Sequence, residues 1–235
     1  MAGDSSSPSG TVPELDRSIH SAPLDQILFD TFGTTRARFV PLSEVSDALQ
    51  TDFRGAITPV ALPAYGALDA LPWLDDDDLV LGYESGDDAY AYPINILNFH
   101  EIVNDTIGGV QVLITYCPLC FRGVVFNREL DGQTLIFGNT SALYESDLVM
   151  SDHQTGLYWF QVAGEAVVGT MTGSRLKPLA LTTMPWGQWK GLHADTFLIT
   201  GSQAGRRPNL RRHVTAAGLG VATKTVSTKA SLPSR

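Results

Sequence analysis

Residues 110–172 form a succession of short segments that are rich in β-branched and aromatic residues. Residues that favour turns, such as Asp131-Gly132 and Ala163-Gly164, separate these segments from one another. Such a composition fits a pleated, half-buried surface, and the regular spacing is typical of antiparallel β-structure. We therefore predict strands at 110–116, 123–127, 134–138, 157–162 and 165–170.

Further elements are predicted on either side of this region. Residues 79–83 and 89–92 are apolar and aromatic segments that flank acidic, turn-forming residues, and they indicate a β-hairpin. A short helix is expected near 186–193, and residues 197–200 have the composition of a last strand.

Apolar residues near position 45 recur with helical spacing. Leu42, Val45 and Leu49 would lie on one face of a helix. Ser43 is a suitable N-cap, because its hydroxyl can accept a hydrogen bond from a backbone amide of the first turn. The pattern therefore predicts a short helix within residues 41–49.

Together these elements predict a β-rich α+β fold, which would be an antiparallel meander or partly open barrel with a few short helices. Strands and helices do not alternate as they do in βαβ units, and the sequence has no glycine loop of the kind that cradles phosphates. Rossmann and thioredoxin-like folds are therefore not expected.

Length and composition are those of one soluble globular domain. The chain has 235 residues, of which 43% are hydrophobic, enough to bury a sizeable core. We expect a partly flexible N-terminal leader at 1–40 and a single β-rich domain at 41–203. Residues 204–235 contain few large apolar residues and are expected to form a basic, disordered tail.

The sequence predicts neither a membrane span nor an export signal. No apolar run approaches the roughly 20 residues that are needed to cross a bilayer. The first ten residues have neither the basic start nor the apolar stretch of a secretory signal, so a cytoplasmic protein is expected. An exported protein whose signal had already been removed would show the same features. The oligomeric state is not predicted.

Charge is distributed unevenly along the chain. Seven of the 16 Lys and Arg lie in residues 204–235, which contain no acid, so the other nine share residues 1–203 with all 25 Asp and Glu. An acidic domain is poorly suited to binding the phosphate backbone of nucleic acids, which requires a cationic surface. A nucleic-acid partner is therefore not expected.

The only two cysteines, Cys117 and Cys120, are separated by two residues. Two thiols at this spacing can bind one soft metal ion together, or they can alternate between dithiol and disulfide. Pro118 lies between them and limits the backbone of the turn, which favours a preorganised pair. Both cysteines are therefore candidates for metal ligation and for catalysis.

Four motifs stand out in the chain: YPINILNFHEIVND at 92–105, TYCPLC at 115–120, SDLVM at 146–150 and WGQW at 186–189. In these motifs the sequence resembles the DUF3179 family, which is named for lacking an assigned function. The resemblance covers about residues 55–200. It implies no reaction and no cofactor, but it marks positions to examine.

A structural zinc site normally has four ligands, so two cysteines need further donors. His100 is the strongest candidate because it belongs to a polar cluster inside an apolar stretch, where burial without partners costs free energy. The cluster consists of Asn98, His100, Glu101, Asn104 and Asp105. A satisfied hydrogen-bond network would explain this cluster equally well. Met150 and His153 are soft or borderline donors that, with two thiolates, would favour copper or zinc. A methionine in the core and a histidine on a surface turn would explain the same two residues.

Three classes of function remain: soft-metal binding, thiol-disulfide exchange by Cys117 and Cys120, and a non-catalytic β module. We favour a copper- or zinc-binding protein because the cluster around His100 has no evident role in a bare dithiol. Redox motifs also usually open a helix, whereas this pair lies between predicted strands. The expected partner is a metal ion, or a small-molecule or thiol substrate.

The sequence contains the residues of two other catalytic arrangements. A single thiolate with His100 as its base is a possible nucleophile. A hydrolase triad with Ser146 and Asp147 is not expected, because no nucleophile elbow precedes a helix. The sequence does not decide whether the protein is an enzyme.

Overall fold

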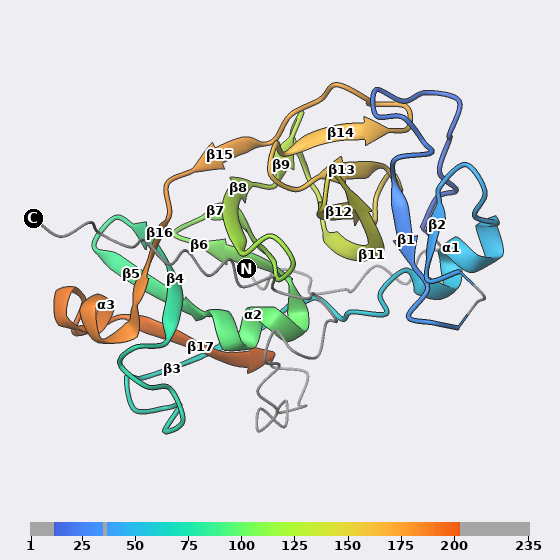
Figure 1. Ribbon diagram of the computed structural model, residues 1–235. Coiled ribbons are helices and arrows are strands. Elements are labelled where there is room, and N and C mark those ends of the chain that lie inside the picture. Colours follow the sequence, from blue (N-terminus) through green and yellow to red (C-terminus); the bar gives the residue numbers. More distant parts are fainter. Residues whose placement is uncertain (1–11, 35–36, 203–235) are drawn as a thin grey trace, which may run out of the picture.

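Three β-sheets lie side by side in the computed structural model, which describes residues 12–34 and 37–202 (Figure 1). The six-stranded sheet contains, in spatial order, β14 (Glu165–Val168), β13 (Tyr158–Phe160), β12 (Asp147–Asp152), β11 (Phe137–Tyr144), β1 (Leu28–Asp30) and β2 (Phe39–Pro41). The central sheet contains β15 (Lys177–Leu179), β8 (Arg122–Asn127), β7 (Val110–Cys117) and β6 (Ile102–Ile107). The five-stranded sheet contains β16 (Thr182–Pro185), β4 (Leu79–Ser85), β5 (Asp88–Pro93), β17 (Phe197–Ser202) and β3 (Pro63–Gly66).

A two-stranded ribbon and three short helices complete the described part of the fold. They are β9 (Glu129–Leu130), β10 (Gln133–Thr134), α1 (Asp47–Phe53), α2 (Ile94–His100) and α3 (Trp186–Leu192). Paired strands of the sheets are antiparallel, apart from β17, which runs parallel to β5. The sheets do not close into a barrel.

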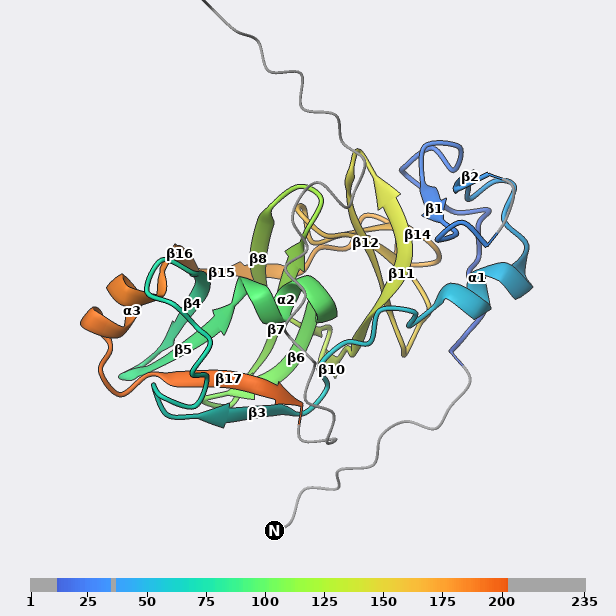
Figure 2. The same cartoon turned by 60° about the horizontal axis from the view of Figure 1, so that its bottom comes forward.

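The central sheet is buried on both faces. It lies between the five-stranded sheet and the six-stranded sheet, and this order is visible from two directions (Figures 1 and 2). Successive side chains of a strand point to opposite faces. In β7, Val112 and Ile114 accordingly belong to the core shared with the five-stranded sheet, whereas Leu113 and Cys117 belong to the core shared with the six-stranded sheet. The position of Cys117 is therefore fixed by the packing of two layers.

Polar residues of the segment 100–105 find partners in neighbouring elements. Asn104 lies on β6 and is buried, and its amide group donates to Phe137 O and accepts from Phe137 N, both at 2.8 Å. This pair of hydrogen bonds joins the central sheet to β11 of the six-stranded sheet. Asp105 accepts hydrogen bonds from the hydroxyls of Tyr65 and Tyr92. Much of the polar cluster singled out in the sequence is thus a hydrogen-bond network.

An N-terminal strap, residues 12–34, covers the outer face of the six-stranded sheet. Its Leu15, Ile27 and Phe29 are buried in a third core together with Val149 of β12. Strand β1 of the strap pairs with β11. Part of the leader predicted at 1–40 therefore contributes to the core, while the division into leader, domain and tail stays a prediction.

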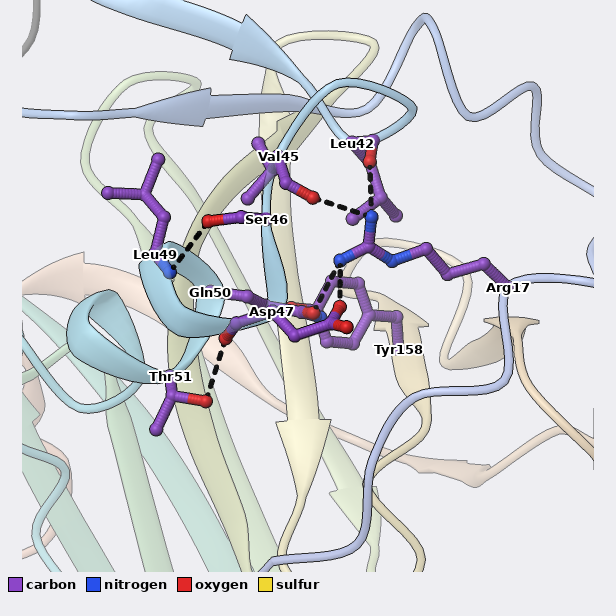
Figure 3. A network of polar contacts seen from close by, with 9 residues as sticks. All are labelled: Arg17, Leu42, Val45, Ser46, Asp47, Leu49, Gln50, Thr51 and Tyr158. Atoms are coloured by element: carbon purple, nitrogen blue, oxygen red, sulfur yellow. Dashed lines mark hydrogen bonds and ion pairs between the residues drawn. The ribbon is translucent and has the colours of Figure 1, made fainter.

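Arg17 joins this strap to helix α1 (Figure 3). Its guanidinium donates four hydrogen bonds, to Leu42 O at 2.9 Å, Val45 O at 2.7 Å, Asp47 Oδ1 at 2.7 Å and Gln50 Oε1 at 2.9 Å. Gln50 donates in turn to the hydroxyl of Tyr158, a buried residue of the third core. A single side chain thus connects the strap, the helix and the six-stranded sheet.

The helix predicted within residues 41–49 begins later than expected. Helix α1 starts at Asp47, and its N-cap is Ser46 rather than Ser43. The carbonyl groups of Leu42 and Val45 accept from Arg17, and the amide of Leu49 bonds to the side chain of Ser46 as in an N-cap. The apolar spacing was therefore informative about burial, and the predicted N-cap was wrong.

Most of the predicted elements are confirmed. The segments 110–116 and 123–127 are β7 and β8, the predicted hairpin is β4 with β5, and the last helix and strand are α3 and β17. The predicted strand at 134–138 is instead divided between β10 and β11. The sequence analysis assigned no element to α2, β6 or β12. The β-rich fold with antiparallel sheets and short helices is confirmed.

Two expectations about the chain as a whole can also be compared with the structure. In the part of the chain that the structure describes, no helix has the length and apolar character required to cross a membrane. The predicted basic tail lies outside the described residues.

Substitution of Arg17 should destabilise the fold. We expect Arg17→Ala to lower the free energy of unfolding by about 1–3 kcal/mol, because it leaves two carbonyl groups and Gln50 Oε1 without the hydrogen bonds from the guanidinium. Urea unfolding measures this change. Arg38→Ala is a suitable control, because Arg38 forms an ion pair with Asp30 while its own side chain is 52% exposed, and exposed pairs contribute about 0–1 kcal/mol. Equal effects of the two substitutions would contradict the role assigned to Arg17.

Candidate metal site

The two cysteines lie on the hairpin that joins β7 to β8. Cys117 is the last residue of β7 and pairs with Arg122, and Cys120 lies in the four-residue loop between these two positions. Cys117 is 1% exposed, and Cys120 is half-buried against the same core. Phe121 closes the loop with a φ of 53°, in the left-handed region that non-glycine residues seldom adopt. The pair therefore lies between two strands, as the sequence indicated.

A second hairpin brings Asp147 to the cysteines. Tyr144 of β11 pairs with Asp147 of β12 across the two residues Glu145 and Ser146, whose φ angles are 50° and 65°. Two positive φ angles are characteristic of the type I′ turn, which matches the twist of a hairpin but usually contains Asn and Gly. Backbone strain of this kind persists where the surrounding structure enforces it, often at functional sites.

The three side chains form a compact cluster of possible metal ligands. One ligand atom from each of Cys117, Cys120 and Asp147 lies within 4.8 Å of the other two. The thiol of Cys120 donates to Asp147 Oδ1 at 3.0 Å, and Asp147 Oδ2 accepts from the backbone amide of Val162 at 2.9 Å. One carboxylate oxygen is therefore held by the backbone while the other faces the sulfur atoms. These three residues can hold a metal ion.

Burial determines the protonation of the two thiols. It raises the pKa of Cys117, and it raises the pKa of Cys120 together with the hydrogen bond to Asp147. Both thiols are therefore protonated near neutral pH when no cation is bound, and the pair lacks the stabilised thiolate of reactive dithiols. A bound cation would reverse this preference, because it favours the thiolate form.

Comparison with known protein families matches residues 54–212 to the family described as "Protein of unknown function (DUF3179)". The chain belongs to the DUF3179 family. The matched range contains all four motifs from which the resemblance was inferred. No curated protein and no solved structure matches the chain. The family therefore supports the expectation from the sequence and leaves the function to be inferred from the site.

His100 of this DUF3179 protein does not belong to the cluster. It is the last residue of α2, and its Nδ1 lies 2.8 Å from Thr58 O. Its Nε2 is buried and has no hydrogen-bond partner among the described residues. A metal ion at the cluster would be held without His100 in this conformation, and its role as a ligand stays a prediction.

Met150 and His153 lie farther along β12 and beyond it. Met150 is fully buried in the core that also contains Cys117. His153 Nε2 lies against Gly138 of β11, and burial, together with the charge of Arg54, lowers the pKa of His153. His153 is absent from the cluster as well. The ligand roles predicted for these two residues stay untested.

Two residues that the sequence analysis did not propose as ligands or site residues belong to the site or its surroundings. Asp147 was considered only as a member of a hydrolase triad, although it lies in the SDLVM motif. Gln161 is fully buried, and its side chain contacts Thr115, two residues before Cys117. The only sequence signal for Gln161 was a polar residue at the end of the apolar segment 157–162.

Glu101 is a second titratable group of this region. It follows α2, has a φ of 57°, and accepts a hydrogen bond from the amide of Asn139 on β11. Burial raises the pKa of Glu101 to about 7, although the bond from Asn139 opposes this shift. The carboxyl group therefore changes its charge near neutral pH.

The stability of the protein should consequently depend on the charge of Glu101. The pKa of its carboxyl group is about 7 in the folded state, above the ordinary value of 4.5. The stability that the protonated carboxyl group contributes is therefore fully present below about pH 4.5 and is lost as the pH rises through 7. Glu101→Gln should remove this loss and be more stable than the wild type at pH 8 by up to about 3 kcal/mol. Urea unfolding at pH 5 and pH 8 tests this, with the exposed Glu129→Gln as control. An equal response of both variants would refute the assignment.

Proposed function

We propose that this protein binds one thiophilic divalent metal ion, zinc in the first place, through Cys117, Cys120 and Asp147. The observation that carries the proposal is the approach of a buried carboxylate from one hairpin to a pair of thiols on another. The two hairpins belong to different sheets, so the cluster is formed by tertiary packing and not by one local turn.

The spacing of the ligand atoms is compatible with tetrahedral coordination of a metal ion. Zinc–sulfur bonds of about 2.3 Å and zinc–oxygen bonds of about 2.0–2.2 Å separate neighbouring ligand atoms by about 3.6–3.8 Å. The three atoms lie within 4.8 Å of one another, and the Cys120 sulfur lies 3.0 Å from the Asp147 oxygen. Binding the ion would require the Cys120 sulfur and the Asp147 oxygen to move somewhat farther apart. The Val162 amide would act as an outer partner that orients the carboxylate.

The donor set favours zinc over copper. Two thiolates and one carboxylate carry three negative charges, which a divalent ion compensates better than copper(I). Carboxylate oxygen is also a harder donor than copper(I) prefers, whereas zinc accepts sulfur and oxygen together. Copper binding that also involved Met150 is the alternative that a metal analysis would reveal.

The same contacts disfavour a dithiol oxidoreductase. An attacking cysteine requires a stabilised thiolate, but burial and Asp147 raise the pKa of Cys120, the more exposed thiol. The environment therefore favours thiols that lose their protons to a metal ion over thiols that react without one.

Metal content of the untagged protein tests the proposal. We expect about one zinc ion per chain after anaerobic purification, and none in the double variant Cys117→Ser, Cys120→Ser. Asp147→Asn should retain the shape of the site but weaken zinc binding at least about tenfold, since it replaces a charged ligand by a neutral one. Competition with a chromophoric chelator measures these affinities.

Asp152→Asn provides the matched control. Asp152 is an equally buried carboxylate on β12, but it binds Trp159 and Thr155 rather than the cysteines. This variant should keep the wild-type affinity for zinc. Undiminished zinc content in the double cysteine variant, or equal losses in Asp147→Asn and Asp152→Asn, would remove the proposal.

Zinc binding should also release protons. Both thiols are protonated in the metal-free protein, so binding near pH 7 should release about two protons per ion and weaken as the pH falls. Calorimetry in buffers with different heats of ionisation measures this number. Cys120→Ser should release about one proton if it still binds the ion. Release of no protons by the wild type would contradict ligation by thiolates.

A further inference from the structure

Gln161 is a buried residue with one unsatisfied polar atom. Its side chain is fully buried, and Oε1 has no hydrogen-bond partner among the described residues. Leaving a buried acceptor without a donor is unfavourable, because the group loses its hydrogen bonds to water and gains none in the protein. An acceptor retained at this cost is a candidate for contact with a bound molecule.

The orientation of the Gln161 amide is determined by its neighbours. Nε2 donates to Thr115 Oγ1 at 2.8 Å and to Arg122 O at 3.4 Å. The hydroxyl of Thr115 donates its own proton to Val124 O, so it can only accept from Gln161. The amide nitrogen therefore faces β7 and β8, and Oε1 is the atom left without a partner.

Three neighbours of Gln161 connect it to the elements that carry the cysteine cluster. Thr115 precedes Cys117 by two residues on β7, so their side chains share one face of the strand. Arg122, whose carbonyl accepts from Gln161, is the cross-strand partner of Cys117. The residue after Gln161 is Val162, whose amide holds Asp147.

We propose that the metal centre keeps a fourth coordination position for a small molecule, and that Gln161 Oε1 accepts a hydrogen bond from that molecule. This inference rests on the proposed metal binding. The ligand class is a small molecule that carries a hydrogen-bond donor beside its metal-binding atom, and water occupies the position otherwise. Three protein ligands with an open fourth position are typical of zinc sites that bind substrates.

The loop that carries Cys120 is the part of the site nearest to solvent. Cys120 is the partly exposed member of the cluster, and the side chains next to it, Leu119 and Phe121, are 47% and 77% exposed. A ligand that approached the metal along this loop would pass these two apolar side chains, which would favour a ligand with a short hydrocarbon part. The hydrogen bond to Gln161 would then distinguish ligands of the same size.

A matched pair of small thiols tests the proposal on the cobalt(II)-loaded full chain. Thiolate binding to cobalt strengthens the sulfur-to-metal charge-transfer absorption, which gives an affinity for each ligand. 2-Mercaptoethanol and 1-propanethiol are similar in size, and only the former has a hydroxyl that can donate to Gln161. We expect the ratio of their affinities to fall about tenfold in Gln161→Met, the effect of one buried hydrogen bond. Cobalt stoichiometry should stay at one per chain.

A third ligand tests the same hydrogen bond in the wild type, without a substitution. In the wild type, 2-methoxyethanethiol should bind about tenfold more weakly than 2-mercaptoethanol, because its ether oxygen cannot donate. Equal affinities of these two thiols, or an unchanged ratio in a folded Gln161→Met, would overturn the role of Gln161. Bound cobalt that fails to respond to any thiol would exclude the open position. Failure of the wild type to bind cobalt or zinc would instead refute the metal site itself.

Discussion

The burial of the central sheet on both faces is the constraint on which the rest of the structure depends. Strand β7 supplies Val112 and Ile114 to one core and Leu113 and Cys117 to the other. A shift of its register by one residue would exchange these two sets, so both neighbouring sheets specify the register. The register of β7 also sets the position of the hairpin at its end. Cys117 is therefore positioned by the packing of all three sheets.

The sequence predicts this fold wherever local pattern and tertiary packing agree. Strands β7 and β8 are such elements, because their apolar and β-branched residues are buried as the pattern indicates. Segment 94–107 is different, because several of its polar groups are satisfied by distant residues, as Asn104 is by Phe137. The two carbonyl groups just before α1 are likewise bound by a remote residue, Arg17, which no local pattern around position 45 reveals.

Only the local half of the candidate site was predictable from the sequence. Cys117 and Cys120 are close in the chain, so their spacing alone indicates a shared task. Asp147 and Gln161 reach them only because the six-stranded sheet packs on the central sheet. Histidines were favoured as additional ligands because they commonly bind zinc and copper. The structure instead brings a carboxylate to the sulfurs. The neighbouring turn at Glu145 and Ser146 has positive φ angles that these residue types do not predict.

The N-terminal strap has a consequence for any fragment limited to the family-matched residues 54–212. That fragment would lack β1, so β11 would become an edge strand with unpaired amide and carbonyl groups. It would also uncover Val149 and Tyr158, which the strap buries. Exposed edges with adjoining apolar surface recruit other chains. Aggregation would then begin at β11, the strand that leads into the turn before Asp147.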